Sequence, residues 1–462
     1  MIRVCIQGLG FVGSAMAAAV ASAKDQKDNF VYEVIGVELP SKAGQMRVDS
    51  INNGKFPFST DDNNLKLSLK KAKDRGNLYA TTESNCYAEA KVVVVDIHLD
   101  IPYLDEAPKL EFKGFISAIK TIGREIRPGT LVLIETTVPP GTCEKIVVPT
   151  LESELIKRRI DPKSIYVAHS YERVMPGKNY LKSITDYWRV FSGHTKEAGD
   201  VCEVFLSNII NIEDFPLTRL SSTNASETAK VMENTYRAMN IAFIDEWTKY
   251  SESIGIDLFE VIKAIGKRPS HSNIRFPGLG VGGYCLTKDP LLASWSKQNL
   301  FEAKKGLDQS IKGVQINDKM PLYAYQFLKK EINNLNGKKI LLLGVSYRSD
   351  VGDTRYTPVE PFYNYLIKDG AKIELHDPYV RFWEEVGLEV DESIDRVFES
   401  ELNIVVITTA HKEYKDSEYL ITLLLKKEEL FIFDTVGLFT NSQISQLSKK
   451  HKVRVVGRGD IN

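Results

Sequence analysis

The chain has 462 residues, too many for one ordinary hydrophobic core, so two or three domains are expected. Its 60 basic and 61 acidic residues nearly cancel, which excludes a strong overall field for nucleic acid or a membrane surface. The five scattered cysteines form neither a disulfide framework nor a metal-ligand pattern. No uncharged apolar stretch approaches the roughly 20 residues of a membrane span. We therefore predict no metal, no nucleic acid and no membrane contact.

The first predicted elements are a strand, a glycine turn and a helix. A β-branched run at Ile2–Gln7 leaves no room for a signal peptide, which indicates a cytoplasmic protein. The turn Gly8-Leu9-Gly10-Phe11-Val12-Gly13 then opens an alanine-rich stretch. In this context the glycines permit close approach to a pyrophosphate, which the helix N-terminus favours. We predict that NAD contacts Gly8, Gly10, Phe11, Val12 and Gly13; the alternative is a glycine turn without a ligand.

A second strand, Tyr32–Leu39, carries Glu38 at its end. An acidic side chain at this position accepts a hydrogen bond from the adenosine ribose 2′-hydroxyl and repels a 2′-phosphate, which favours NAD over NADP. Lys42 lies nearby in sequence and slightly weakens this discrimination.

Further strand-like runs alternate with helical stretches and predict a doubly wound parallel sheet. They are Lys91–Ile97, Thr130–Thr136, Ser164–Ala168 and Trp188–Ser192. Ligands bind at the carboxyl ends of such strands, and two of these ends continue into polar segments, Glu135–Thr142 and His169–Lys178. Their hydroxyls and carboxylates could position water or relay protons, or they could be ordinary turn residues around Pro139-Pro140-Gly141.

A helical region follows, in which Ser221–Ser253 is predicted as one long helix that stops at Gly255. Lys230 and Asn234 are spaced i, i+4 and share a face of it, which indicates either a site or a solvated polar stripe. A short helix within 257–266 and a helical stretch from Leu291 to Lys330 complete a block that could form an oligomer interface.

Between these helices lies Gly278-Leu279-Gly280-Val281-Gly282-Gly283-Tyr284-Cys285, followed by Asp289-Pro290. Asp is a preferred N-cap and Pro a preferred first helical residue, so we expect Cys285 on a tight loop just ahead of a helix. That environment lowers a thiol pKa and produces a nucleophile. The alternative is a glycine-rich turn with an inert, buried cysteine.

From Lys339 the alternation restarts with strands at Ile340–Gly344, Lys372–His376, Asn403–Thr409 and Leu430–Asp434. This second sheet lacks the glycine turn, and its first loop presents Arg348 and Arg355, which suit phosphate recognition. The predicted fold is α/β, with two Rossmann-like doubly wound domains joined by a central helical region. We predict an NAD-binding domain at 1–212, a central helical domain at 213–325 and a second α/β domain at 326–462.

In this order the motifs resemble the UDP-glucose/GDP-mannose dehydrogenase family along nearly the whole chain. The resemblance is carried by Gly8–Gly13, Thr136–Thr142, Glu227–Asn234, Gly280–Pro290, Gly344–Arg348 and Asp353–Arg355. It implies two successive NAD-dependent oxidations that convert the C6 alcohol of a UDP-sugar to a carboxylate for surface polysaccharide synthesis. It also implies a homodimer or a larger homo-oligomer, with a central domain that serves catalysis and dimerisation and a last domain that binds a UDP-sugar.

The resemblance further implies residue roles. Cys285 would form a thiohemiacetal and then a thioester, while Lys230 and Asn234 would stabilise the substrate oxyanion. Asp289 and Thr137 would position the hydrolytic water, Thr137 also touching the cofactor, and Glu172 would act as general acid–base. The substrate would contact Arg173, Lys230, Asn234, Gly282, Arg348 and Arg355. Asp289 could equally be an N-cap.

Some features leave the substrate open. Tyr171–Gly177 and Asn273–Val281 look like the subgroup acting on UDP-N-acetylhexosamines, which we favour, whereas Lys288 looks like the UDP-glucose subgroup. Val95–Asp100 departs from the family pattern and places Asp96 and His98 near the nicotinamide end. Two alternative hypotheses for the function are a two-electron alcohol dehydrogenase with an inert Cys285 and a nucleotide-sensing protein without catalysis.

Overall fold

The computed structural model describes residues 1–99, 103–104, 107–174, 177–415 and 417–461. Asp100, Met175 and Pro176, which belong to segments discussed above, lie outside the described residues. The chain forms two compact units, one of Met1–Glu233 with Leu291–Leu307, the other of Asn234–Pro290 with Asp308–Asn462. The central helical region therefore contributes to both units. None of the helices in the described ranges is long and apolar enough to cross a membrane.

An eight-stranded sheet forms the first unit, in the order β10-β9-β8-β7-β4-β1-β2-β3. Its six strands β3-β2-β1-β4-β7-β8 have the order of a dinucleotide-binding fold and are parallel. The expectation of a wholly parallel sheet is wrong at one edge, because β9 runs antiparallel to β8. The strands are β1 (Ile2–Gln7), β2 (Tyr32–Val37), β3 (Leu78–Thr81), β4 (Val92–Val95), β7 (Leu131–Ile134), β8 (Tyr166–Tyr171), β9 (Val190–Gly193) and β10 (Thr218–Arg219).

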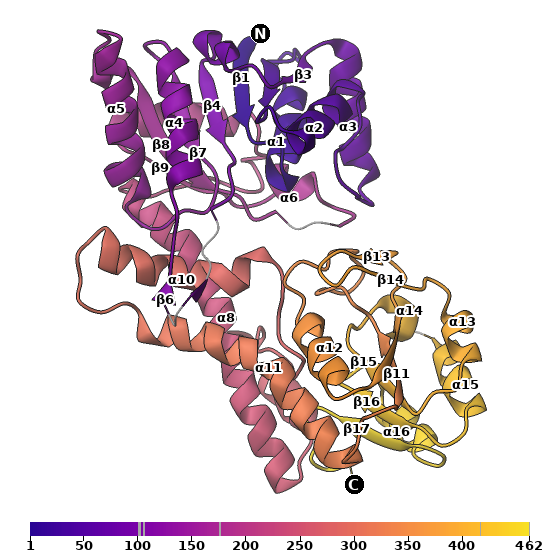
Figure 1. Ribbon diagram of the computed structural model, residues 1–462. Coiled ribbons are helices and arrows are strands. Elements are labelled where there is room, and N and C mark those ends of the chain that lie inside the picture. Colours follow the sequence, from indigo (N-terminus) through magenta and orange to yellow (C-terminus); the bar gives the residue numbers. More distant parts are fainter. Residues whose placement is uncertain (100–102, 105–106, 175–176, 416, 462) are drawn as a thin grey trace. The chain divides into compact units, whose positions relative to one another are not determined.

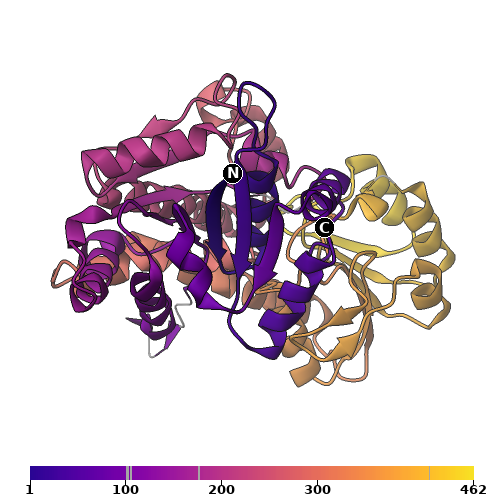
Figure 2. The same ribbon diagram turned by 90° about the horizontal axis from the view of Figure 1, so that it is seen from above.

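Helices cover both faces of this sheet (Figures 1 and 2). One face packs against α1, α3, α6 and α7, and the opposite face packs against α4 and α5. Buried β-branched and alanine side chains fill both layers, as a parallel sheet with two covered faces requires. The helices are α1 (Phe11–Ser22), α2 (Lys42–Asn52), α3 (Asn63–Arg75), α4 (Lys113–Glu125), α5 (Val148–Lys157), α6 (Lys182–Thr185) and α7 (Lys196–Ser207); a short hairpin is formed by β5 (Tyr103–Leu104) and β6 (Ala107–Pro108).

The predicted long helix is present as α8 (Thr223–Ile254) and ends before Gly255, whose φ of +75° suits a helix stop. Asp257 caps α9 (Leu258–Ile265) by accepting hydrogen bonds from the N–H groups of Phe259 and Glu260. The last predicted helical stretch is divided into α10 (Tyr284–Asn299) and α11 (Asp308–Ile332).

A five-stranded parallel sheet forms the core of the second unit, in the order β12-β11-β15-β16-β17. This doubly wound order confirms the second α/β domain, although the sequence analysis missed its edge strand β17. The strands are β11 (Lys339–Leu343), β12 (Lys372–His376), β15 (Ile404–Ile407), β16 (Phe431–Asp434) and β17 (Lys452–Val455), with a small hairpin of β13 (Phe382–Trp383) and β14 (Leu388–Glu389). The helices are α12 (Val359–Lys368), α13 (Ile394–Glu399), α14 (Lys412–Lys415), α15 (Glu418–Lys426) and α16 (Asn441–Leu447).

Candidate active site

The glycine turn between β1 and α1 packs tightly against neighbouring backbone. Gly8 has a φ of +94°, and a Cβ there would lie 2.5 Å from the carbonyl oxygen of Asp96. A Cβ on Gly13 would lie 1.9 Å from the carbonyl oxygen of Gly8. Gly10 is the N-cap of α1 and has no side chain with which to cap it. The backbone N–H groups at this helix end, where Phe11 and Val12 begin α1, therefore suit a pyrophosphate.

Glu38 lies at the end of β2 beside this turn. Its Oε1 accepts hydrogen bonds from the backbone N–H of Leu9 at 2.8 Å and from Nε of Arg47 at 2.7 Å. The basic neighbour of the buried Glu38 is thus Arg47 on α2, whereas the sequence analysis had considered Lys42, which is exposed at the start of α2. Arg47 follows Glu38 by nine residues and reaches it from helix α2. This contact is visible in the structure but not in the local sequence pattern.

Asp96 and His98 line the other side of the glycine turn. The Asp96 Cβ would lie 3.3 Å from a Cβ on Gly13, and His98 Nε2 would lie 3.5 Å from a Cβ on Gly10. Burial raises the pKa of Asp96 well above its usual value, and the neighbouring Glu135 and Glu172 add to this. The departure from the family pattern thus brings a buried carboxyl group to the cofactor end of the sheet.

Lys230 and Glu172 meet within the first unit. The Lys230 ammonium donates a hydrogen bond to the Glu172 carbonyl oxygen at 2.8 Å and lies 3.8 Å from the carboxylate Oε1. It also lies 5.3 Å from the centroid of the Tyr171 ring. Both side chains are largely shielded from solvent, which strengthens their electrostatic interaction. The predicted cation and the predicted acid–base group thus lie together.

The turn that carries Thr137 is anchored to α8 by Glu227. The Glu227 carboxylate is fully buried and accepts hydrogen bonds from the N–H groups of Gly141 at 2.6 Å and Cys143 at 2.8 Å. Burial raises the pKa of Glu227 to about 7, although these bonds oppose the shift. Thr137 itself is half-buried just beyond β7. The sequence pattern marked Glu227 as the first residue of a family-like segment and gave no sign of this anchor.

Arg173, a predicted substrate contact, is engaged in an ion pair. Its Nη2 lies 2.9 Å from Glu233 Oε2, and its Nε donates to both carboxylate oxygens of Glu233 at 3.1 Å. The guanidinium also donates to the Tyr171 hydroxyl at 3.3 Å and to the Trp188 carbonyl. These contacts hold Arg173 beside the segment that carries Glu172.

Cys285 lies inside a helix and not on a loop ahead of one, so this prediction is wrong. The helix α10 begins at Tyr284, which makes Cys285 its second residue, while Asp289 and Pro290 lie inside the helix. Proline at this point removes one backbone donor, and the helix nevertheless starts earlier, where Gly282 and Gly283 end the loop. Cys285 is exposed in the first helical turn, so the expected proximity to a helix N-terminus is retained.

Asp289 is not an N-cap. Its side chain is fully buried, and its Oδ2 accepts a hydrogen bond from Nδ2 of Asn234 at 2.7 Å. Its Oδ1 lies 3.1 Å from the Lys288 ammonium. Because Asp289 follows Cys285 by four residues on α10, the two side chains share a helix face. The second unit therefore brings the predicted residues Asn234, Asp289 and Cys285 to one place.

The glycines before Cys285 permit close packing against the loop after β11. A Cβ on Gly282 would lie 2.2 Å from the Tyr356 carbonyl oxygen, and a Cβ on Gly283 would lie 2.8 Å from the Tyr347 ring. The N–H of Gly283 donates to the Arg355 carbonyl at 3.0 Å. Gly282, a predicted substrate contact, thus also holds the start of α10 against this loop.

The two predicted phosphate-binding arginines differ in their surroundings. Arg348 is exposed on the loop after β11. Arg355 donates to Asp353 through Nε at 2.9 Å and through Nη2 at 2.6 Å, so part of its charge is compensated within the loop. It also lies 5.9 Å from the centroid of the Tyr284 ring, next to Cys285. Both arginines are on the loop that packs against the start of α10.

Three models of the UDP-glucose/GDP-mannose dehydrogenase family match the chain in succession: the NAD binding domain at residues 2–209, the central domain at 224–313 and the UDP binding domain at 341–441.

Relatives align over almost the full length. A UDP-N-acetyl-D-mannosamine dehydrogenase of Methanocaldococcus jannaschii is 30% identical over 459 residues, which cover 99% of this chain and 97% of that protein. A UDP-N-acetyl-D-glucosamine 6-dehydrogenase of Pseudomonas aeruginosa is 25% identical over 438 residues, 94% of this chain and 96% of that protein. The solved structure of a UDP-D-ManNAc dehydrogenase from Pyrococcus horikoshii superposes with a TM-score of 0.84 at 26% identity, covering 100% of both chains.

Proposed function

From the premise that this chain belongs to the UDP-glucose/GDP-mannose dehydrogenase family and is an NAD-dependent oxidoreductase, we propose that it oxidises the C6 alcohol of a UDP-N-acetylhexosamine to the uronic acid in two steps. The observation that carries this proposal is the contact between Asn234 and Asp289 on the helix face of Cys285. A thiol on the same helix face as this amide–carboxylate pair can add to an aldehyde as a nucleophile, whereas oxidation of an alcohol to an aldehyde requires no nucleophile.

The first unit supplies the groups that bind and orient NAD. Gly8 and Gly13 allow the tight turn that leads into α1, the start of α1 suits the pyrophosphate, and Glu38 suits the adenosine ribose. NAD, when bound there, accepts the hydride released at each oxidation. Thr137, on the turn anchored by Glu227, would contact the cofactor and help to position water.

The proposed first step converts the alcohol to an aldehyde. Lys230 stabilises the developing negative charge on the substrate oxygen through its ammonium, together with the Asn234 amide. The contact between Lys230 and Glu172 supports this role, because the carbonyl and carboxylate oxygens of Glu172 hold the ammonium in place. Glu172 in turn is our candidate for the general acid–base group.

The second step uses the thiol. Cys285 adds to the aldehyde as a thiohemiacetal, loss of a second hydride leaves a thioester, and water cleaves the thioester to the acid. Asp289 positions that water while Asn234 holds Asp289. Arg348 and Arg355 bind the diphosphate, with Arg173 and Gly282 as further substrate contacts, so that binding energy from the nucleotide orients the reacting carbon.

The N-acetylhexosamine is favoured because the relatives named above act, by their names, on UDP-N-acetyl-D-mannosamine and UDP-N-acetyl-D-glucosamine. UDP-glucose is the second candidate, since the segment with Lys288 resembles that subgroup. The test is NADH formation with UDP-ManNAc, UDP-GlcNAc, UDP-GalNAc, UDP-glucose and GDP-mannose at equal concentrations. Fastest turnover with an N-acetylated sugar supports the proposal; fastest turnover with UDP-glucose or GDP-mannose overturns this choice of substrate. We also propose that the protein acts in the cytoplasm and that its uronic acid product is used in polysaccharide synthesis.

We further propose that the protein is a homodimer that pairs through α8. An apolar stripe recurs along one face of this helix at Tyr236, Phe243, Trp247, Tyr250 and Ile254, and each of these side chains is between 44 and 55% exposed. Such a stripe in a solvent-facing helix is typical of an interface. Light scattering of Trp247→Glu should give half the wild-type mass, whereas Phe382→Glu, an exposed aromatic in the same unit, should not change it. A wild-type monomer, or a Trp247→Glu dimer, contradicts the proposal.

A further inference from the structure

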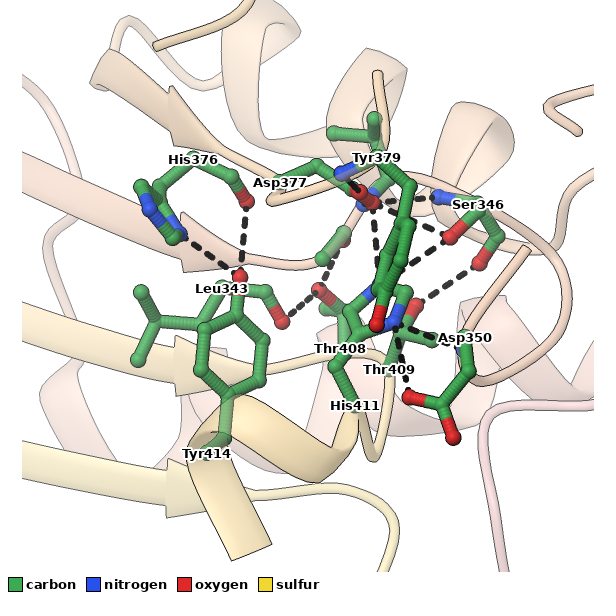
Figure 3. Close-up of polar contacts among 12 residues, drawn as sticks. Leu343, Ser346, Asp350, His376, Asp377, Tyr379, Thr408, Thr409, His411 and Tyr414 are labelled. Atoms are coloured by element: carbon green, nitrogen blue, oxygen red, sulfur yellow. Dashed lines mark hydrogen bonds and ion pairs between the residues drawn. The ribbon is translucent and has the colours of Figure 1, made fainter. Parts of the chain in front are cut away.

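Three loops at the carboxyl ends of β11, β12 and β15 meet at the buried side chain of His411 (Figure 3). Its Nδ1 accepts a hydrogen bond from the backbone N–H of Asp350 at 2.9 Å. Its Nε2 lies 3.1 Å from Oδ2 of Asp377 and 3.1 Å from Oγ of Ser346. Because Nδ1 accepts, Nε2 carries the ring proton and donates it toward Asp377.

Asp377 is the second centre of this network. Its Oδ2 accepts from the N–H groups of Val345 at 2.8 Å and Ser346 at 3.1 Å, and from the Ser346 hydroxyl at 3.0 Å. Burial alone would raise the pKa of Asp377, but hydrogen bonds from His411 and these backbone groups outweigh it and lower the pKa. The buried carboxylate is therefore ionised and fully used as an acceptor.

Serine, histidine and aspartate meet here, yet the geometry is not that of a nucleophile. In a hydrolytic triad the serine and the aspartate contact different ring nitrogens. Here Ser346 and Asp377 both face Nε2 of His411, while Nδ1 is taken by a backbone N–H. The Ser346 hydroxyl also donates to the carboxylate. The cluster is therefore an anchor for a loop.

The loop that it anchors is 345–350. Its two ends are held: the Thr409 hydroxyl donates to the Ser346 carbonyl at 2.7 Å, and the Lys412 N–H donates to Oδ1 of Asp350 at 2.8 Å. Asp350 has a φ of +61°, a left-handed conformation that is uncommon for non-glycine residues, although aspartate adopts it more readily than most. Between the anchors lie Tyr347 and Arg348.

These two residues connect different parts of the candidate site. Arg348 is one of the two arginines proposed for the diphosphate. The Tyr347 ring packs on Gly283, at the start of the helix that carries Cys285, and burial raises the pKa of the Tyr347 hydroxyl, with a further contribution from Cys285. A movement of loop 345–350 would therefore displace both the phosphate-binding cation and the surface on which the cysteine helix begins.

We propose that His411 is a positioning residue which, through loop 345–350, couples diphosphate binding at Arg348 to the alignment of Cys285. This inference rests on the proposed function for the roles of Arg348 and Cys285. It assigns to His411 an effect on substrate affinity and on thiol reactivity, although His411 touches neither group.

The test measures iodoacetamide alkylation of Cys285 by peptide mass spectrometry, with and without UDP, together with KM for the UDP-sugar. UDP should change the wild-type alkylation rate about fivefold or more. His411→Leu should reduce that change to less than about twofold. It should also raise KM about tenfold, which is the scale of one lost charge-assisted contact. His411→Asn, whose Oδ1 can still accept the Asp350 N–H, should restore part of the UDP effect. Thr409→Val, a milder loss of one loop contact, should act in the same direction.

The matched control is His451→Leu. His451 is also buried in the second unit, and its Nδ1 also accepts a backbone N–H, that of Leu430 at 3.1 Å, but it does not hold loop 345–350. It should keep the UDP effect. Any one of three results overturns the inference. The first is an unchanged UDP effect in both His411→Leu and Thr409→Val. The others are an equal loss of the effect in His451→Leu and no UDP effect in the wild type. Alkylation needs no turnover, so failure of the proposed oxidation remains a separate result.

Discussion

The Lys230 ammonium donates a hydrogen bond to the carbonyl oxygen of Glu172 at 2.8 Å. The lysine comes from α8 and the glutamate from the segment after β8, so 58 residues of chain separate a predicted cation from a predicted acid–base group. The contact also places the positive charge of Lys230 3.8 Å from the Glu172 carboxylate. A charge held in this way needs little reorganisation when negative charge develops on a substrate oxygen.

Replacing Lys230 by Met removes this charge and keeps most of the side-chain volume. We expect kcat to fall by about 10²- to 10³-fold, the usual effect of losing one oxyanion-stabilising group, with little change in NAD affinity. Steady-state kinetics and NAD titration measure the two effects. Lys249→Met is the control, because Lys249 also lies on α8 and pairs with Asp245 at 2.6 Å. Equal losses of turnover and NAD binding in Lys230→Met would indicate a structural role.

Replacing Asn234 by Ala leaves the buried Asp289 carboxylate with fewer donors. We expect a stability loss of about 1 to 3 kcal/mol from the unsatisfied acceptor, and slower release of the acid, because Asp289 no longer holds water in place. Denaturant unfolding and product analysis test this. Asn240→Ala is the control, since Asn240 on the same helix is half-buried and its amide donates to the Tyr236 carbonyl at 2.8 Å instead of to Asp289. Wild-type turnover in Asn234→Ala would remove Asn234 from the mechanism.

Glu227 should make stability depend on pH. Its pKa is about 7 in the folded protein against an ordinary 4.5, so between these values the folded state binds more protons than the unfolded state. Stability conferred by Glu227 therefore falls as pH rises through this window, by about 3 kcal/mol in total. The free energy of unfolding of the wild type should fall more steeply from pH 5 to pH 8 than that of Glu227→Gln. Parallel curves would contradict the assignment.

Gly283 should not tolerate a side chain. Its φ is +78°, and a Cβ would lie 2.8 Å from the Tyr347 ring. Gly337, in the same unit, has a φ of +74° with nothing within 4 Å of a Cβ. Alanine at Gly337 should cost about 1 kcal/mol from backbone strain alone. Alanine at Gly283 should cost more and also slow Cys285 alkylation or turnover. Equal effects of the two substitutions would show that the contact with Tyr347 is unimportant.

Local patterns predicted much of this structure. Periodicity and glycine spacing predicted the β1 turn, the length of α8 and both doubly wound sheets, because each is encoded in short stretches. The start of α10 was misplaced, since the pattern Asp289-Pro290 has the chemistry of a helix start, while packing of Gly282 and Gly283 on the loop after β11 decides where the helix begins. Contacts between distant residues, such as Arg47 with Glu38 or His411 with Asp377, leave no local signal.

The two-step oxidation is tested by the number of NADH formed per molecule of UDP-sugar consumed, measured in the wild type and in Cys285→Ala. We expect two NADH per sugar with the uronate as product in the wild type. We expect no uronate in Cys285→Ala, because without the thiol the second oxidation has no thiohemiacetal to act on. One NADH per sugar in the wild type, or full uronate production by Cys285→Ala, would contradict the proposal.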